Sequence, residues 1–185
     1  MPTSANPPAL RLFFALWPDA ALRARLVAHA ARWRLAPPAR ATRPEQLHLT
    51  LLFMDRVPPS ALDSLCAIGA AVAARTARFE FTLDAARVWP GGGIAHLAPH
   101  QPPPALLALH AALRDAVVAA ALPCDRRAFS AHVTLARRAD PAAAPAAVAP
   151  LPWPAARLSL VQSMLGEGRY VVRGSWALDA APPAA

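Results

Sequence analysis

The segment HLTL at residues 48–51 has a counterpart, HVTL, at residues 132–135. Each segment lies in an apolar run that is typical of a β-strand. Side chains two residues apart along a strand share a face, so the histidine and the threonine of each segment should project together. The intervening apolar residues should face a core, a set that extends in the first copy to Phe53. Each strand is therefore expected to present a histidine and a hydroxyl on its open face.

The repetition of this pattern carries more weight than either copy alone. One copy would most simply be a strand histidine that has found a hydrogen-bond partner. Two copies stand 84 positions apart (132 − 48) among only six histidines. Chance would give such a pair on the order of once in several hundred sequences of this composition. The pair therefore favours a shared function.

The two segments resemble the paired motifs of the 2H phosphoesterases, and within them those of the bacterial RNA 2',3'-cyclic phosphodiesterases, also called 2'-5' RNA ligases. The resemblance extends over nearly the whole chain, from an opening strand at 11–16 through the motifs at 47–53 and 129–137 to closing strands at 158–163 and 170–178. It implies an α+β, bilobal fold with a pseudo-two-fold. Two antiparallel sheets would form a central cleft, with helices outside and one motif on each side.

Two histidines on opposite walls of a cleft suit the opening of a five-membered 2',3'-cyclic phosphate. That reaction needs a water activated on one side of phosphorus and a proton given to the departing ribose oxygen on the other. Imidazole can serve in either role because it titrates near neutrality. Threonine hydroxyls can donate to the phosphate oxygens on which charge grows. The symmetry of the sequence leaves open which histidine is the base.

The resemblance assigns these roles. It implies that His48 is the proton donor to the 3'-oxygen and His132 the proton acceptor from water, with a 2'-phosphomonoester as product. It also implies the reverse reaction, a 2'-5' RNA ligation. Thr50, Thr134 and Arg137 would bind the substrate phosphate. Strand alternation puts Arg137 on the face opposite His132, unless a bulge intervenes or the strand ends near Ala136.

The charge and composition of the chain bound its partners. Its 185 residues carry a net charge of +8 from 19 arginines and no lysine, which favours a polyanion such as RNA. Two further interpretations stay open: a phosphodiesterase of a small cyclic nucleotide, and a non-catalytic module that binds RNA ends. The 11 acidic residues have no metal-ligand spacing, so we expect no metal and no cofactor. No apolar run is long enough to span a membrane, and we expect a cytoplasmic monomer.

The pattern of elements is that of one domain over residues 10–179, with disordered, proline- and alanine-rich tails at 1–9 and 180–185. Besides the two motif strands, we expect a helix capped by Asp19, a second helix after Pro59, a hairpin across 90–93 and a helix over 102–121. Residues 140–154 read as a loop, and the chain closes with a hairpin from 157 to 178.

Overall fold

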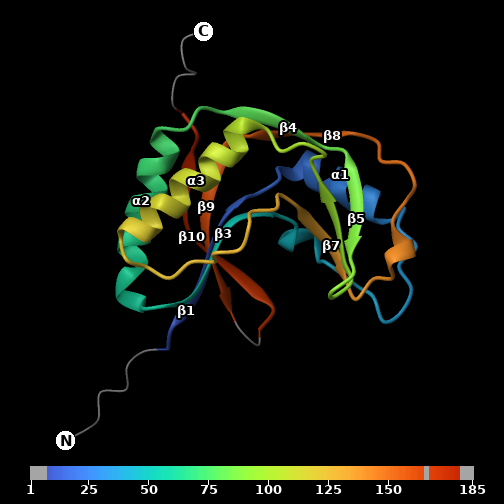
Figure 1. The fold of residues 1–185 in the computed structure, drawn as a ribbon, viewed down its shortest axis with the longest axis horizontal. Helices are drawn as coiled ribbons and strands as arrows, with labels where there is room; N and C mark the ends of the chain where they lie inside the picture. The colour runs from blue at the N-terminus through green and yellow to red at the C-terminus, as the bar shows by residue number, and fades with distance from the viewer. Residues whose placement is uncertain (1–7, 165–166, 180–185) are drawn as a thin grey trace, which may run out of the picture.

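The computed structural model describes residues 8–164 and 167–179. The tails predicted at 1–9 and 180–185 lie outside these residues, except for Pro8 and Ala9. The elements labelled in Figure 1 are the strands β1 (Leu10–Leu16), β2 (Arg40–Ala41), β3 (Leu49–Val57), β4 (Phe79–Leu83), β5 (Ala85–Trp89), β6 (Ile94–Ala98), β7 (Val133–Arg137), β8 (Leu151–Ala155), β9 (Arg157–Met164) and β10 (Arg169–Ala177), and the helices α1 (Ala20–Ala30), α2 (Leu62–Ala74) and α3 (Pro104–Ala119).

The main sheet is nearly divided at its centre. Its strands run antiparallel in the order β10-β9-β1-β3-β7-β6-β5, with β2 also paired to β7, while β4 and β8 form a separate two-stranded sheet. The central strands β3 and β7 are paired only through Leu49 and Val133. Each motif strand thus belongs to a different half of the molecule. The predicted bilobal α+β fold is confirmed, and within the main sheet one residue pair joins its two halves.

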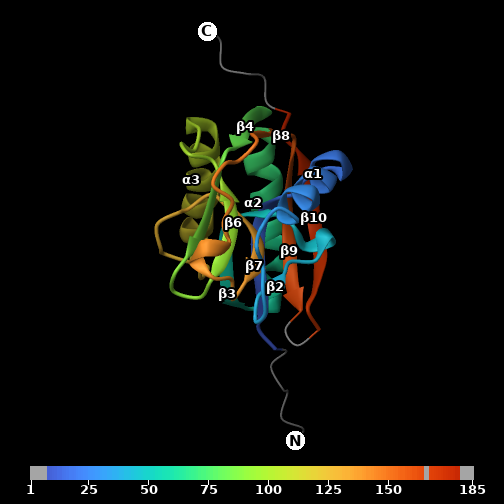
Figure 2. The same ribbon diagram turned by 90° about the vertical axis from the view of Figure 1, so that its right-hand side faces the viewer.

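The two halves are not the two halves of the chain. The first half of the molecule combines β1 and β3 with the C-terminal strands β9 and β10, and the second combines β2 with β5, β6 and β7. In Figure 1 these groups lie on opposite sides of the molecule, and Figure 2 turns the second group toward the viewer. The chain therefore passes repeatedly between the lobes, which ties them into one domain.

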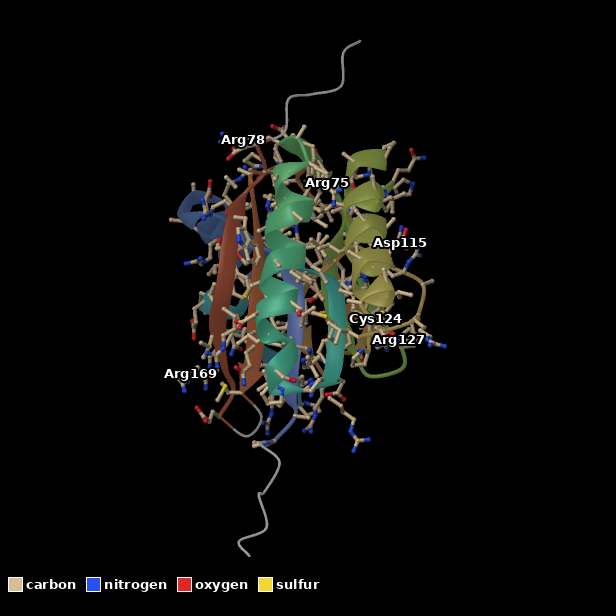
Figure 3. The ribbon with its side chains drawn as sticks, turned by 90° about the vertical axis from the view of Figure 1, so that its left-hand side faces the viewer. Arg75, Arg78, Asp115, Cys124, Arg127 and Arg169 are labelled. Carbon is tan, nitrogen blue, oxygen red and sulfur yellow. The ribbon has the colours of Figure 1, made fainter. Side chains whose placement is uncertain are left out.

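Helices α2 and α3 cover the outer face of the first half. α2 packs against β9 and β10, and α3 packs against β3 and α2; Figure 3 shows the two helices side by side in front of the strands. The main apolar core lies beneath them and continues under β4 and β8, from Phe14 and Leu65 to Leu97 and Trp153. α1 packs against β8, and the Asp19 carboxylate accepts from the Leu22 N–H at 2.7 Å, so the predicted cap is confirmed.

The prediction of a loop over 140–154 is wrong at its end. Leu151–Ala155 forms β8, in which alternate apolar residues are buried and Pro152 and Pro154 are exposed. These prolines lie opposite Thr82 and Glu80 of β4. Among the described residues β8 pairs with only one neighbour, so one of its edges is free of strand hydrogen bonds. Proline, which has no N–H, is therefore tolerated in β8, whereas a central strand would need that donor.

Candidate active site

A bulge in β3 decides which of its side chains reach the cleft. Ala15 is paired with Thr50 and Phe14 with Leu52, so Leu51 is an extra residue without a partner on β1. A bulge of one residue reverses the alternation of faces. Phe53 consequently lies on the cleft face beside Phe13 and Tyr170, and the prediction that it faces the core is wrong.

Contacts from the rest of the chain stabilise this bulge. The Nδ1–H of His110, on α3, donates to the Leu51 carbonyl oxygen at 2.8 Å. The backbone N–H of Asp125 donates to the Phe53 carbonyl oxygen, also at 2.8 Å. The His110 ring stacks on Phe129, with centroids 4.2 Å and planes 7° apart. The segment that follows α3 is thereby tied to β3 next to the first motif.

His48 lies just before β3 and its two ring nitrogens have defined partners. Its Nδ1 is 2.6 Å from the Gln46 carbonyl oxygen, and because a carbonyl only accepts, Nδ1 carries a proton. Its Nε2 is 3.0 Å from Thr50 Oγ1, so the predicted common face of this pair is confirmed. Burial, opposed by the bond to Gln46 and aided by the nearby charges of His132 and Arg137, lowers the pKa of His48 to about 4.

His132 is held in the same way on the other side. Its Nδ1 donates to the Ser130 carbonyl oxygen at 2.7 Å. Trp89 lies edge-on to its ring at 4.5 Å and His96 at 5.6 Å between centroids. Burial is the main cause that lowers the pKa of His132, and His96 and Arg137 add to it. In both motifs Nδ1 is bonded to a backbone carbonyl, so Nε2 is the ring nitrogen that can exchange a proton with a substrate.

The structure brings together every residue that the sequence nominates. A pocket of about 180 Å³ is lined by His48, Thr50, His132, Thr134 and Arg137. Arg137 reaches it because β7 also bulges: His96 is paired with Thr134 and Ala95 with Ala136, which leaves Leu135 extra. The bulge that would reconcile Arg137 with the face of His132 is therefore present. Tyr170, which sequence analysis does not single out, also lines this pocket.

The inner pocket opens into a larger groove. This outer groove has a volume of about 740 Å³ and shares Thr50, His132, Arg137 and Tyr170 with the inner pocket. The acidic side chain that lines it, Asp125, accepts hydrogen bonds from Arg127 at 2.9 and 3.0 Å. The remaining charge along the groove is positive, from Arg11 and Arg137.

The part of the chain that the structure describes was compared with the requirements of a metal site and of a membrane-spanning helix. Within residues 8–164 and 167–179, no group of three or more histidine, cysteine or acidic side chains is placed to hold a metal ion. None of the helices in the described part of the chain is both long and apolar enough to cross a bilayer.

Comparison with known proteins identifies relatives that share this fold. A family model described as "2'-5' RNA ligase superfamily" matches residues 18–164. An RNA 2',3'-cyclic phosphodiesterase of Thermus thermophilus is 32% identical over 164 residues, covering 84% of this chain and 83% of the relative. The structure of E. coli LigT in apo form superposes with a TM-score of 0.79 at 28% identity, covering 93% of this chain and 99% of LigT. LigT complexed with 3'-AMP superposes with a TM-score of 0.78 at 29% identity, covering 92% and 98%.

Proposed function

This chain belongs to the 2'-5' RNA ligase superfamily, and from that premise we propose that it hydrolyses RNA 2',3'-cyclic phosphate ends to 2'-phosphomonoesters. The observation that carries the proposal is the meeting of His48 and His132, from two different halves of the molecule, in one pocket with two threonines and an arginine. The relative from T. thermophilus is named an RNA 2',3'-cyclic phosphodiesterase, which supports the proposal. A metal ion is not required, because the two imidazoles supply both proton transfers.

The proposed reaction assigns one proton transfer to each histidine. The Nε2 of neutral His132 accepts a proton from water while the water oxygen attacks phosphorus. The bond from phosphorus to the 3'-oxygen breaks, and Nε2–H of protonated His48 gives its proton to that oxygen. The phosphate stays on the 2'-oxygen. When an RNA 5'-hydroxyl attacks phosphorus in place of water, the same breakage of the bond to the 3'-oxygen gives the proposed 2'-5' ligation.

Thr50, Thr134 and Arg137 are assigned to the non-bridging phosphate oxygens. Their hydroxyl and guanidinium groups line the pocket with both histidines, and donors fixed in advance stabilise the charge that develops during phosphoryl transfer. The monomeric state stays a prediction. The cytoplasmic location stays a prediction.

The lowered pKa values of the two histidines affect the two roles in opposite ways. A lowered pKa keeps His132 neutral and ready to accept a proton. A pKa of about 4 leaves His48 mostly unprotonated at neutral pH, which opposes its role as donor. A bound phosphodiester anion next to Nε2 raises the pKa of His48, since an opposite charge favours the protonated form. Substrate binding should therefore be accompanied by uptake of a proton.

The experiment that tests this function is incubation with a short RNA that ends in a 2',3'-cyclic phosphate, in the presence of a chelator, followed by mapping of the product. We expect a 2'-phosphate. A 3'-phosphate would retain the enzyme but reverse the ribose between the histidines, and inhibition by the chelator would contradict metal-free catalysis. Binding of the RNA without turnover would favour an end-binding module, and turnover of small cyclic nucleotides alone would favour the other alternative.

A further inference from the structure

The reacting phosphate and its nucleotide need more space than the inner pocket provides. The volume of the inner pocket is about 180 Å³. Pockets that enclose a drug-sized ligand begin at roughly 300 Å³. The outer groove of about 740 Å³ continues from it across shared residues. The rest of the substrate should therefore occupy the outer groove.

The chemistry of the substrate fixes what lies next to the reacting group. In an RNA that ends in a 2',3'-cyclic phosphate, both the 2'- and the 3'-oxygen of the last ribose are used. The chain can continue only through the 5'-oxygen. The next negative charge that the protein meets is thus the phosphate on the 5' side of the terminal nucleotide.

Arg11 is placed to meet this charge. It lines the outer groove but not the inner pocket, so it does not share the reacting phosphate with Arg137. Arg11 and Phe13 stand two residues apart on β1, roughly 7 Å along one face of a strand. The Phe13 ring lies 4.9 Å from His48 between centroids. His48 also stacks on Trp17, so it lies on the Trp17 side of Phe13. Arg11 lies on the other side, farther from the reacting phosphate.

The guanidinium of Arg11 lies over an aromatic ring of the cleft. Its Cζ lies 4.7 Å from the centroid of Phe53, the ring that the β3 bulge turns into the cleft. Its Nε is buried and has no hydrogen-bond partner among the described residues. Arg11 takes part in none of the salt bridges among the described residues, so an anion in the groove would supply an opposite charge for its guanidinium. Arg127 also lines the outer groove but not the inner pocket. It is paired with Asp125 and points outward (Figure 3), and its side chain is 85% exposed.

We propose that Arg11 binds the phosphate on the 5' side of the terminal nucleotide, so that the enzyme favours RNA ends over nucleoside 2',3'-cyclic phosphates. This inference rests on the proposed function and adds a second phosphate site to it. The stacked Phe53 ring orients the guanidinium, and the groove carries the ribose between the two phosphates.

The test compares two substrates that differ in one phosphate: adenosine 2',3'-cyclic phosphate with and without a 5'-phosphate. For the wild-type protein we expect kcat/KM to be on the order of tenfold higher with the 5'-phosphate, a ratio typical of one charge-assisted contact. Arg11→Gln should bring the ratio near one, and Arg11→Lys should restore part of it. Arg23→Gln is the matched control, because Arg23 also has a buried, unpaired Nε but does not line the groove; its ratio should stay at the wild-type value.

A wild-type ratio near one, or a ratio that Arg11→Gln leaves unchanged, would overturn the inference while leaving the hydrolysis in place. If no cyclic substrate is turned over, the proposed function fails. The role of Arg11 as a phosphate ligand is then tested by the affinities of two nucleotides. Adenosine 2',5'-bisphosphate should then bind more tightly than adenosine 2'-phosphate to the wild type and to Arg23→Gln, but not to Arg11→Gln. Equal affinities in the wild type would refute the second phosphate site.

Discussion

The indole ring of Trp17 lies almost parallel to the imidazole of His48, with centroids 4.9 Å apart and planes at 12°. Phe13 covers the ring at 4.9 Å and Tyr170 meets it edge-on at 5.4 Å. Three aromatic side chains thus exclude water from one histidine of the pair. This aromatic enclosure is the physical cause of the burial that lowers the pKa of His48.

Removal of the indole should raise the pKa of His48. In Trp17→Leu the ring gains water on one side, so its pKa should move from about 4 toward 6.5. A higher pKa means that more of His48 is protonated at a given alkaline pH. NMR titration of the imidazole measures the shift, and kcat/KM at pH 8 should rise in parallel if the chemical step is intact. A pKa of His48 that stays near 4 would show that its cause lies elsewhere.

The wild-type pH profile should slope downward through the alkaline range. The free enzyme must hold one proton, on His48, and the pKa values of both His48 and His132 lie below the ordinary 6.5. Above both values, the productive fraction falls by about tenfold per pH unit. We expect this slope in kcat/KM from about pH 7 upward. The kcat profile should extend to higher pH, because bound phosphate raises the pKa of His48; coincident profiles would contradict that coupling.

Each histidine should be indispensable. His48→Ala and His132→Ala should each lower kcat by on the order of 10²- to 10⁴-fold, the contribution usual for a positioned acid or base. His100→Ala is the control, since His100 is exposed and lines neither pocket. Thermal unfolding of all three variants separates loss of chemistry from loss of fold. Wild-type turnover by either motif variant would refute the two-histidine mechanism.

The two threonine hydroxyls should contribute mainly to the transition state. Thr50→Val and Thr134→Val keep the shape of the side chain and remove its donor, and each should lower kcat by on the order of tenfold to a hundredfold with a smaller change in KM. Thr82→Val, on β4 and outside both pockets, tests the same substitution where no effect is expected. A change in KM alone would instead assign the hydroxyls to ground-state binding.

Gly69 should be required for the packing of α2 on the sheet. A Cβ at this position would come within 2.6 Å of Trp176 Cη2 and 3.0 Å of Phe14 Cε1. The Trp176 ring also lies against Gly174, which blocks its movement toward that side. Overpacking costs about 1–3 kcal/mol and exceeds the gain of about 1 kcal/mol in helix propensity. Gly69→Ala should therefore lower the urea midpoint, whereas Gly91→Ala, whose Cβ would meet nothing within 4 Å, should not.

Local chemistry in the sequence was sufficient for much of the site. Alternation along a strand put His48 and Thr50 on one face, which their hydrogen bond of 3.0 Å confirms. The side chain of Asp19 predicted a helix start that the structure has. These features depend on neighbours within a few residues, so sequence spacing specifies them.

The faces beyond each motif could not be predicted in this way. Phe53 was expected in the core and lies in the cleft. Arg137 could not be assigned to one face of its strand without the register of β7. Both outcomes depend on a single extra residue in a strand, Leu51 in one and Leu135 in the other. Nothing in the alternation of apolar residues distinguishes a bulge from a regular strand, because apolar side chains occur on both sides of it.

Residue spacing was thus enough to predict the α+β class of the fold and to nominate the residues proposed to carry the chemistry. These are a histidine and a threonine on one face of each of two strands. How these strands meet depends on contacts between distant segments that residue spacing does not specify. They are joined through one pair, Leu49 and Val133, and a distant histidine, His110, bonds the carbonyl of the β3 bulge. The physical reason is that strand pairing and bulges are fixed by hydrogen bonds between segments far apart in the chain, where local periodicity has no influence.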